Sequence, residues 1–75
     1  MKTDNSINRR DVEITEDTEF TGLVMGSMRA RAGVILILRG SVAKDLHLEE
    51  GVRLELYGQV GGDIVNRGGL IVHNS

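Results

Sequence analysis

The sequence lacks cysteine and has only two aromatic residues, Phe20 and Tyr57. Without cysteine, the chain can form neither a disulfide nor a cysteine-ligated metal site. Two aromatic side chains give no platform on which the bases of single-stranded nucleic acid could stack. The formal net charge of −2 provides no electrostatic attraction to nucleic acid either. The composition therefore excludes nucleic acid as an expected partner, and we expect no cofactor.

The sequence also lacks a long apolar run. No stretch of its 75 residues is apolar for long enough to cross a bilayer, and its charged, polar start has no signal-peptide core. We therefore expect no membrane contact and a cytoplasmic location. Residues 1–11 show no periodicity, and we expect them to form a flexible N-terminal tail. Residues 12–75 are expected to form one domain with a small core.

Glycine, by contrast, recurs in two series with a constant 18-residue spacing. The two series are Gly22, Gly40, Gly58 and Gly33, Gly51, Gly69. Within the same period, aliphatic residues recur at every sixth position. Six residues make one short strand plus a corner, and three such units make a triangular coil. The second glycine series falls where the chain must turn, and glycine tolerates the positive φ of tight corners.

Alternation within the repeats favours strands. Leu54 and Leu56 alternate with Arg53 and Glu55, which is typical of a half-buried strand, with even-numbered positions pointing inward. We therefore predict an all-β fold, a short three-sided parallel β-helix (β-solenoid) with an 18-residue coil. The general preference for right-handed parallel crossovers predicts a right-handed path. A small β-sandwich or meander, the alternative, would not require two glycine series in one register.

One coil carries apolar residues at positions that the alternation predicts to point outward. These positions hold Leu23, Met25, Ile35 and Ile37, and one coil later they hold Ser41, Ala43, Arg53 and Glu55. Apolar residues outside a solenoid need cover. We interpret the first four, together with Phe20 as a plug at the N-terminal end of the core, as a candidate interface. Either the N-terminal arm, through Val12 and Ile14, or a second subunit would cover them.

The candidate chemical groups favour structural roles. Asp45 and Asp63 fall in one column with Ser27, where two carboxylates about 4.8 Å apart are close enough to hold a cation. Because each follows a corner, we expect both to accept backbone hydrogen bonds instead. His47 is expected beside Arg29 and Val65, and His73 beside Ile37 and Glu55, on a different side of the triangle. We accordingly predict no catalytic, cofactor-binding or metal-binding residues.

Two further columns concern register and the end of the solenoid. Arg31, Glu49 and Arg67 alternate in sign, and such cross-strand pairs help to fix register. Asn66 and Asn74 fall in inward columns, so the core is predicted to turn polar at its C-terminal end.

Four units carry a resemblance to a known family. They are GSV from Gly40, DLHL from Asp45, LEL from Leu54 and GQVGGDI from Gly58, with Gly51 and Gly69 between and after them. In these units the sequence resembles bactofilins, bacterial polymer-forming β-solenoid proteins, from Gly22 to the C-terminus. The resemblance implies a right-handed, three-sided parallel β-helix that assembles end to end into filaments without nucleotide. The chain departs from that family in having about three predicted coils and in starting without an apolar membrane-targeting segment.

Hexapeptide acyltransferases, which form left-handed helices with the same coil length, are a second comparison. Their inward positions usually include a small residue, whereas Val52, Leu54 and Leu56 are all large, and no loop is present to hold a catalytic histidine. The sequence therefore predicts a non-enzymatic scaffold that forms a homo-oligomer or short polymer through its solenoid ends and the candidate interface. The alternatives are a small protein-binding module of the inhibitor or immunity type and, last, an acyltransferase.

Overall fold

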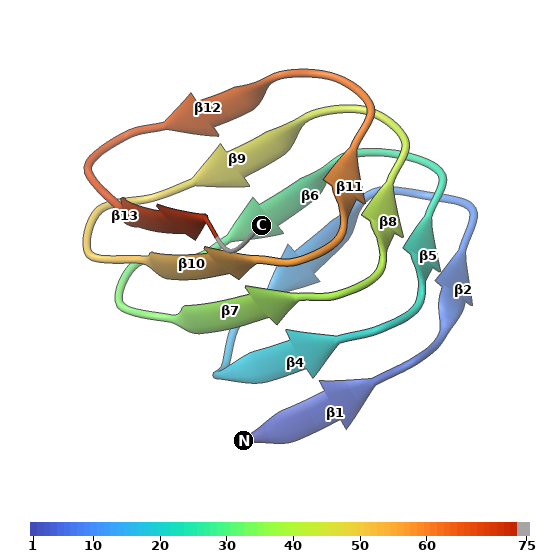
Figure 1. Cartoon of the computed structure of the whole chain (residues 1–75), viewed down its shortest axis with the longest axis horizontal. Coiled ribbons are helices and arrows are strands. Elements are labelled where there is room, and N and C mark those ends of the chain that lie inside the picture. Colours follow the sequence, from blue (N-terminus) through green and yellow to red (C-terminus); the bar gives the residue numbers. More distant parts are fainter. Residues whose placement is uncertain (74–75) are drawn as a thin grey trace.

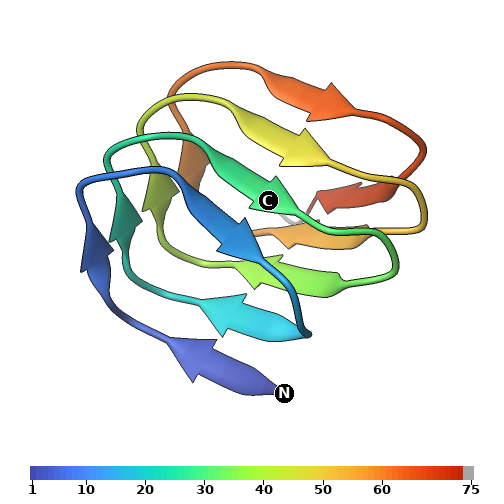
Figure 2. The same cartoon turned by 180° about the vertical axis from the view of Figure 1, so that it is seen from behind.

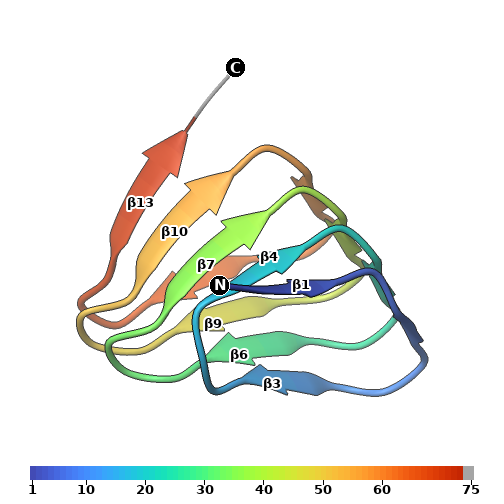
Figure 3. The same cartoon turned by 90° about the horizontal axis from the view of Figure 1, so that it is seen from below.

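The chain winds into a three-sided coil built only of strands. The computed structural model describes residues 1–73, and the three sides are three parallel sheets (Figure 1). Four coils are complete, and a last strand begins a fifth. Seen from the N-terminal end, the chain runs clockwise as it recedes, so the coil is right-handed (Figure 3). The predicted fold class is confirmed.

Each sheet collects one strand from every coil. Sheet A contains β1 (Lys2–Asp4), β4 (Thr18–Phe20), β7 (Ile35–Leu38), β10 (Arg53–Leu56) and β13 (Leu70–His73). Sheet B contains β2 (Ile7–Asn8), β5 (Leu23–Val24), β8 (Ser41–Val42) and β11 (Gln59–Val60). Sheet C, whose four strands lie side by side in Figure 2, contains β3 (Val12–Ile14), β6 (Met28–Ala30), β9 (Leu46–Leu48) and β12 (Ile64–Asn66). Residues 1–73 form no helix, so the described chain has none that is long and apolar enough to cross a membrane.

The core is a stack of apolar side chains that point inward from all three sheets. Its fully buried aliphatic members include Val24, Met28, Ala30, Leu36, Leu38, Val42, Leu46, Leu48 and Leu54. All occupy even-numbered positions. Successive side chains of a strand point to opposite faces, and a coil with an even number of residues therefore places even-numbered side chains inside in every coil. The predicted inward positions are confirmed through the second and third coils.

The coils are not all of equal length. Leu36 pairs with Thr18 and with Leu54, an 18-residue step in each direction. Thr18, however, pairs with Lys2, which is a 16-residue step. At the other end Leu54 pairs with Ile71, a 17-residue step. The predicted 18-residue period therefore describes the middle of the chain, whereas the first coil is two residues shorter and the last is one residue shorter.

Residues 1–11 belong to the solenoid, which differs from the prediction of a flexible tail. Lys2–Asp4 and Ile7–Asn8 form strands β1 and β2, and each pairs in register with the strand above it. The 16-residue spacing places two polar residues, Asp4 and Asn8, in the inward columns. The sequence of residues 1–11 does not show the solenoid repeat, because the 18-residue spacing is replaced by a 16-residue one and polar residues stand at positions that hold aliphatic residues elsewhere.

The polar inward residues of the first coil bind one another. Ser6 donates its backbone N–H and its hydroxyl to Asp4 Oδ1 at 2.9 and 2.6 Å. Asn8 Nδ2 in turn donates to Ser6 Oγ at 2.9 Å. The side-chain and backbone hydrogen bonds from Ser6 hold the pKa of Asp4 below its ordinary value. This hydrogen-bonded chain closes the N-terminal end of the core, and Phe20, the predicted plug, lies fully buried one coil further in.

The C-terminal corner also differs from the prediction. The positive φ falls at Gly68, at 120°, and not at Gly69. The one-residue shift places Ile71 inward beside Leu54 and sets His73 beside Leu56, so the predicted pairing of His73 with Ile37 and Glu55 is wrong. Asn66 lies beside Leu48 as predicted, and its Oδ1 accepts the N–H groups of both glycines at 3.1 and 2.6 Å. The prediction for Asn74 lies outside the described residues.

The two glycine series have different physical causes. Gly33 and Gly51 adopt positive φ angles of 79° and 77°, as predicted for corners. Gly22, Gly40 and Gly58 have no positive φ. A Cβ at Gly40 would instead collide with the carbonyl oxygen of Gly22, and one at Gly58 with that of Gly40. Adjacent coils approach so closely along this column that only glycine fits.

Candidate interaction surfaces

The structure separates the five residues of the predicted interface. Phe20 is fully buried and belongs to the core. Leu23, in β5, and Met25, just after it, lie on the outside of sheet B, whereas Ile35 and Ile37 lie in β7 of sheet A. The predicted interface therefore divides into two surfaces on adjoining sides of the triangle.

The N-terminal arm does not cover either surface. Val12 and Ile14 lie in β3, where they pair with Met28 and Ala30 of sheet C. Ile14 is buried in the core and Val12 packs against it. Cover by the arm, one of the two predicted possibilities, is thus ruled out because these side chains are used inside the solenoid.

The outer face of sheet B is apolar in its first two coils. Ile7 lies beside Leu23 in register. Ile7 is 72% exposed and Met25 51% exposed, so we call Ile7, Leu23 and Met25 the sheet B strip. The four strands of this sheet contain no charged residue, since they read IN, LV, SV and QV. Sequence reasoning missed Ile7 because a 16-residue step, and not the 18-residue one, leads from it to Leu23.

The outer face of sheet A is apolar in its centre and charged around it. Ile37 lies between Glu19 and Glu55 in register. Arg39 Nε is 2.9 Å from Glu19 Oε2, and its guanidinium lies over the Tyr57 ring, 4.4 Å from the ring centroid. Arg53 Nε lies 3.8 Å from Glu55 Oε2. Each of the two glutamates therefore has an arginine neighbour of its own.

The aspartate column is a ladder of hydrogen bonds between coils. Ser27 donates its N–H to Asp11 Oδ1 at 2.8 Å, and Ser27 Oγ accepts the N–H of Asp45 at 3.3 Å. Asp45 Oδ1 then accepts the N–H of Asp63 at 3.0 Å. The predicted acceptance of backbone hydrogen bonds is confirmed for Asp45. Within residues 1–73, no three His, Asp or Glu side chains lie close enough together to hold a metal ion.

The outer face of sheet C and the corner that follows it carry charged side chains in adjacent coils. Arg31 Nη1 is 3.2 Å from Glu13 Oε2, and Arg31 Nε is 3.3 Å from Glu49 Oε2. The hydrogen bond to Glu13, and then the charges of Glu49 and Glu13, raise the pKa of Arg31. The predicted contact of Arg31 with Glu49 is confirmed. Arg67, the third member of that column, makes no ion pair within the described chain.

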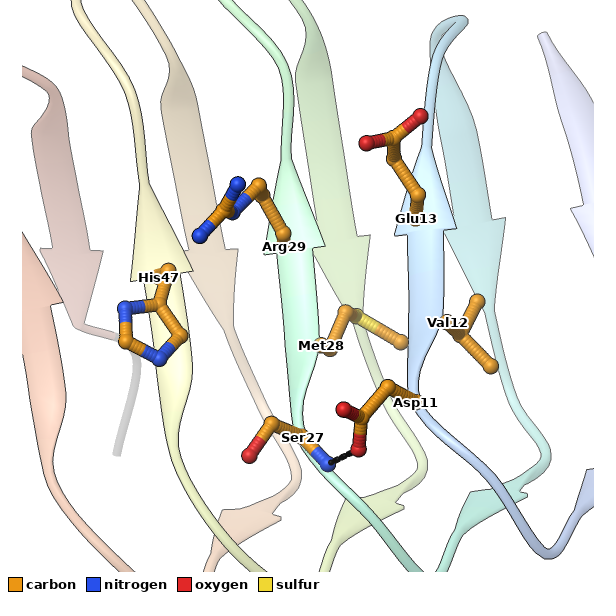
Figure 4. A pocket seen from close by; sticks show the side chains of 7 residues that line it. All are labelled: Asp11, Val12, Glu13, Ser27, Met28, Arg29 and His47. Atoms are coloured by element: carbon orange, nitrogen blue, oxygen red, sulfur yellow. Dashed lines mark hydrogen bonds between the residues drawn. The ribbon is translucent and has the colours of Figure 1, made fainter.

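Two adjoining hollows lie on the same outer face of sheet C. The larger has a volume of about 380 Å³ and reaches from Asp11, just before β3, and Glu13 on β3 across to His47 on β9. The smaller, about 140 Å³, is lined by Arg29, His47, Glu49 and Arg67. In Figure 4 the Arg29 side chain points toward β9 and away from Glu13. His47 lies beside Arg29 and Val65, as predicted. His47 lies in β9 of sheet C and His73 in β13 of sheet A, so the two residues are on different sides of the triangle, as predicted.

No protein family, curated protein or solved structure matches this chain. The architecture is that of a β-solenoid, which is compatible with a solenoid-type repeat. No match supports the bactofilin family in particular.

Proposed function

We propose that this protein is a non-enzymatic scaffold that binds copies of itself through the outer face of sheet B. The observation that carries the proposal is the sheet B strip, where Ile7 and Met25 are 72% and 51% exposed on a sheet whose strands hold no charged residue. Apolar side chains gathered on one outer face are a common mark of a contact surface.

A second copy is the partner that suits this face best. A two-fold contact sets the same patch of both subunits against itself, so any charge in the patch would meet its own sign near the axis. The strands of sheet B avoid that repulsion because they are uncharged. Two sheets packed face to face lie about 10 Å apart, a spacing that the side chains of Ile7, Leu23 and Met25 can fill.

The solenoid ends offer a second contact that would extend pairs into short polymers. Within residues 1–73, the strands of the first coil and β11, β12 and β13 each pair on one side only. The last coil also leaves Leu56, Val60, Ile64 and Ile71 only partly buried. Unpaired strand edges beside apolar side chains favour pairing with another chain.

Light scattering coupled to size exclusion, from micromolar to millimolar protein, tests the proposal. We expect a concentration-dependent dimer or larger species, and Ile7→Glu should weaken it at least about tenfold by placing a charge in the contact. Ile35→Glu, on sheet A, is the matched control and should leave assembly unchanged. A wild-type monomer at millimolar concentration would contradict the proposal, as would equal weakening by both variants. Transfer of an acyl group from acyl-CoA to an acceptor would contradict the non-enzymatic part.

A protein-binding module is the second candidate, and the sheet A face favours it. Ile37 lies between Glu19 and Glu55, and each of these glutamates has an arginine neighbour, so the apolar centre of this face is surrounded by charges of both signs. A different protein with an apolar centre and a rim of complementary charges would suit this face. Affinity capture with wild type, Ile35→Glu and Ile7→Glu separates the candidates, since only Ile35→Glu should release such a partner.

The cytoplasmic location stays a prediction.

A further inference from the structure

From Arg29 onward, the arginines divide into two groups. Arg31, Arg39 and Arg53 each lie within 4 Å of a glutamate oxygen, at 3.2, 2.9 and 3.8 Å. Arg29 and Arg67 have no such carboxylate partner within residues 1–73. Both line the smaller hollow on sheet C, on either side of His47. Of all seven arginines, four form no ion pair within residues 1–73, and two of these four, Arg29 and Arg67, share a hollow.

The nearest carboxylates are already engaged elsewhere. Glu13 lies beside Arg29 in register, yet its Oε2 contacts Arg31. Figure 4 shows the Arg29 guanidinium pointing toward β9 and away from Glu13. Glu49, which lines the hollow, directs Oε2 to Arg31 Nε at 3.3 Å. Arg31 thus forms an ion pair with both glutamates and a hydrogen bond with Glu13, whereas Glu49 Oε2 is buried without a hydrogen bond, and Arg29 faces the hollow.

We propose that this hollow, lined by Arg29, His47, Glu49 and Arg67, binds an oxyanion group, a phosphate or a carboxylate, of a small ligand. With Glu49 counted as −1 and each arginine as +1, its lining carries a formal charge of +1. A guanidinium presents planar, paired N–H donors that match phosphate and carboxylate oxygens. The volume of about 140 Å³ equals the share of roughly five water molecules at ~30 Å³ each, which accommodates a small anion.

The site extends over more than one coil, which sets a preference among ligands. Arg29 is in β6 of the second coil, and Arg67 follows β12 of the fourth. Two coils are about 9.6 Å apart at an interstrand spacing of ~4.8 Å. A ligand with two anionic groups reaches both arginines, whereas a single small anion contacts one fully. We expect diphosphates or dicarboxylates to bind more tightly than their single-group counterparts.

Nuclear magnetic resonance of the ¹⁵N-labelled full chain tests this inference. Inorganic phosphate, pyrophosphate, acetate and succinate are titrated separately, at an ionic strength held constant with sodium chloride. We expect saturable amide shifts centred on residues 29, 47, 49 and 67, with pyrophosphate or succinate binding more tightly than phosphate or acetate. Comparison of the phosphate and carboxylate arms identifies which source of the oxyanion the site prefers.

Matched variants decide whether the hollow is responsible. Arg29→Gln and Arg67→Gln should each weaken pyrophosphate or succinate binding by about tenfold, since each removes a charged donor pair. Arg53→Gln makes the same charge change on sheet A and should alter binding by less than about twofold if only the hollow contributes. The spectrum of each variant confirms that it remains folded. Equal weakening by Arg53→Gln, non-saturating shifts, or the same shifts with chloride alone would overturn the inference.

Discussion

The first coil and the middle coils share one backbone path and differ in what fills it. In the second and third coils the inward side chains are fully buried apolar residues such as Leu36 and Leu46. In the first coil two inward positions hold Asp4 and Asn8, joined through Ser6 by hydrogen bonds of 2.6–2.9 Å. The comparison shows that parallel pairing continues the coil past polar inward positions, whereas apolar packing, which the first coil supplies through Val12 and Ile14, is concentrated further along the chain.

This difference predicts a gradient of stability along the solenoid. Each coil contacts only its neighbours, so the stability of such a protein is approximately a sum over coils and their contacts. Hydrogen bonds among exposed side chains contribute little net free energy, because water offers equivalent partners. The first coil should therefore open locally while the middle coils stay intact. Of the three predictions that follow, the first two compare a site at the first coil with a site in the middle, and the third tests the first coil alone.

Substitution of the close-packed glycines should give the largest effect. At Gly40 an added Cβ would collide with the Gly22 carbonyl oxygen, and both glycines lie between well-packed coils. No side-chain rotation relieves a contact with backbone, so Gly40→Ala should lower the free energy of unfolding by about 4 kcal/mol. At Gly22 the collision is with the Ser6 carbonyl. Because the first coil can move away, Gly22→Ala should cost about half as much, or ~2 kcal/mol.

Urea unfolding followed by circular dichroism measures both losses. Gly33→Ala is the control, because its φ of 79° is strained for alanine although no atom lies within 4 Å of the added Cβ. It should cost about 1 kcal/mol. Equal losses at Gly22 and Gly40 would show that the first coil is as rigid as the middle.

Truncation of inward side chains should give an intermediate effect. Leu36 is fully buried between β4 and β10, so Leu36→Ala should lower the free energy of unfolding by about 3 kcal/mol. Val12, in the first coil, is only partly buried. Val12→Ala should cost about 1 kcal/mol, since less area is lost and the site can collapse. The same urea experiment measures both, and a loss at Val12 as large as that at Leu36 would contradict the gradient.

The sequence made the middle coils predictable because coil length and side-chain period agree there. With an 18-residue coil, Leu36 and Leu54 keep one parity, and the position of each neighbour follows by addition. The column of Asp45 and Asp63 was found in the same way, and so was its structural role.

The ends were not predictable because a change of one or two residues in coil length leaves no local mark. One residue fewer before β13 reverses parity, so Val72, expected inward, pairs with the outward Glu55. Two residues fewer in the first coil preserve parity but misalign every column, which hid Ile7 from the candidate interface. The outward positions of Leu23 and Ile35 were recognised from alternation, but their separation onto two sheets depends on where the corners lie.

The smallest predicted effect is the response of the first coil to acid. Because Ser6 donates two hydrogen bonds to the carboxylate, the folded-state pKa of Asp4 is lower than its unfolded-state value. The resulting stabilisation is fully present above the ordinary aspartate pKa of about 3.9 and is lost as the pH falls through the folded-state pKa. Asp4 is only partly buried, at the open end of the solenoid, so solvent keeps the contribution small.

Comparison of wild type with Asp4→Asn isolates that contribution, since asparagine keeps an acceptor oxygen and does not titrate. Wild type should be slightly more stable at neutral pH, and the difference should shrink as the pH falls below about 4. In the same range the Ser6 amide resonance should titrate with a midpoint below that of an unstructured aspartate. Ser6→Ala removes the hydroxyl donor and keeps the backbone N–H, so it should raise the midpoint of the Asp4 resonances. A midpoint at or above the ordinary value, or no change in Ser6→Ala, would mean that the hydrogen bonds from Ser6 to Asp4 do not stabilise the first coil. The gradient of stability along the solenoid would then depend on apolar packing alone.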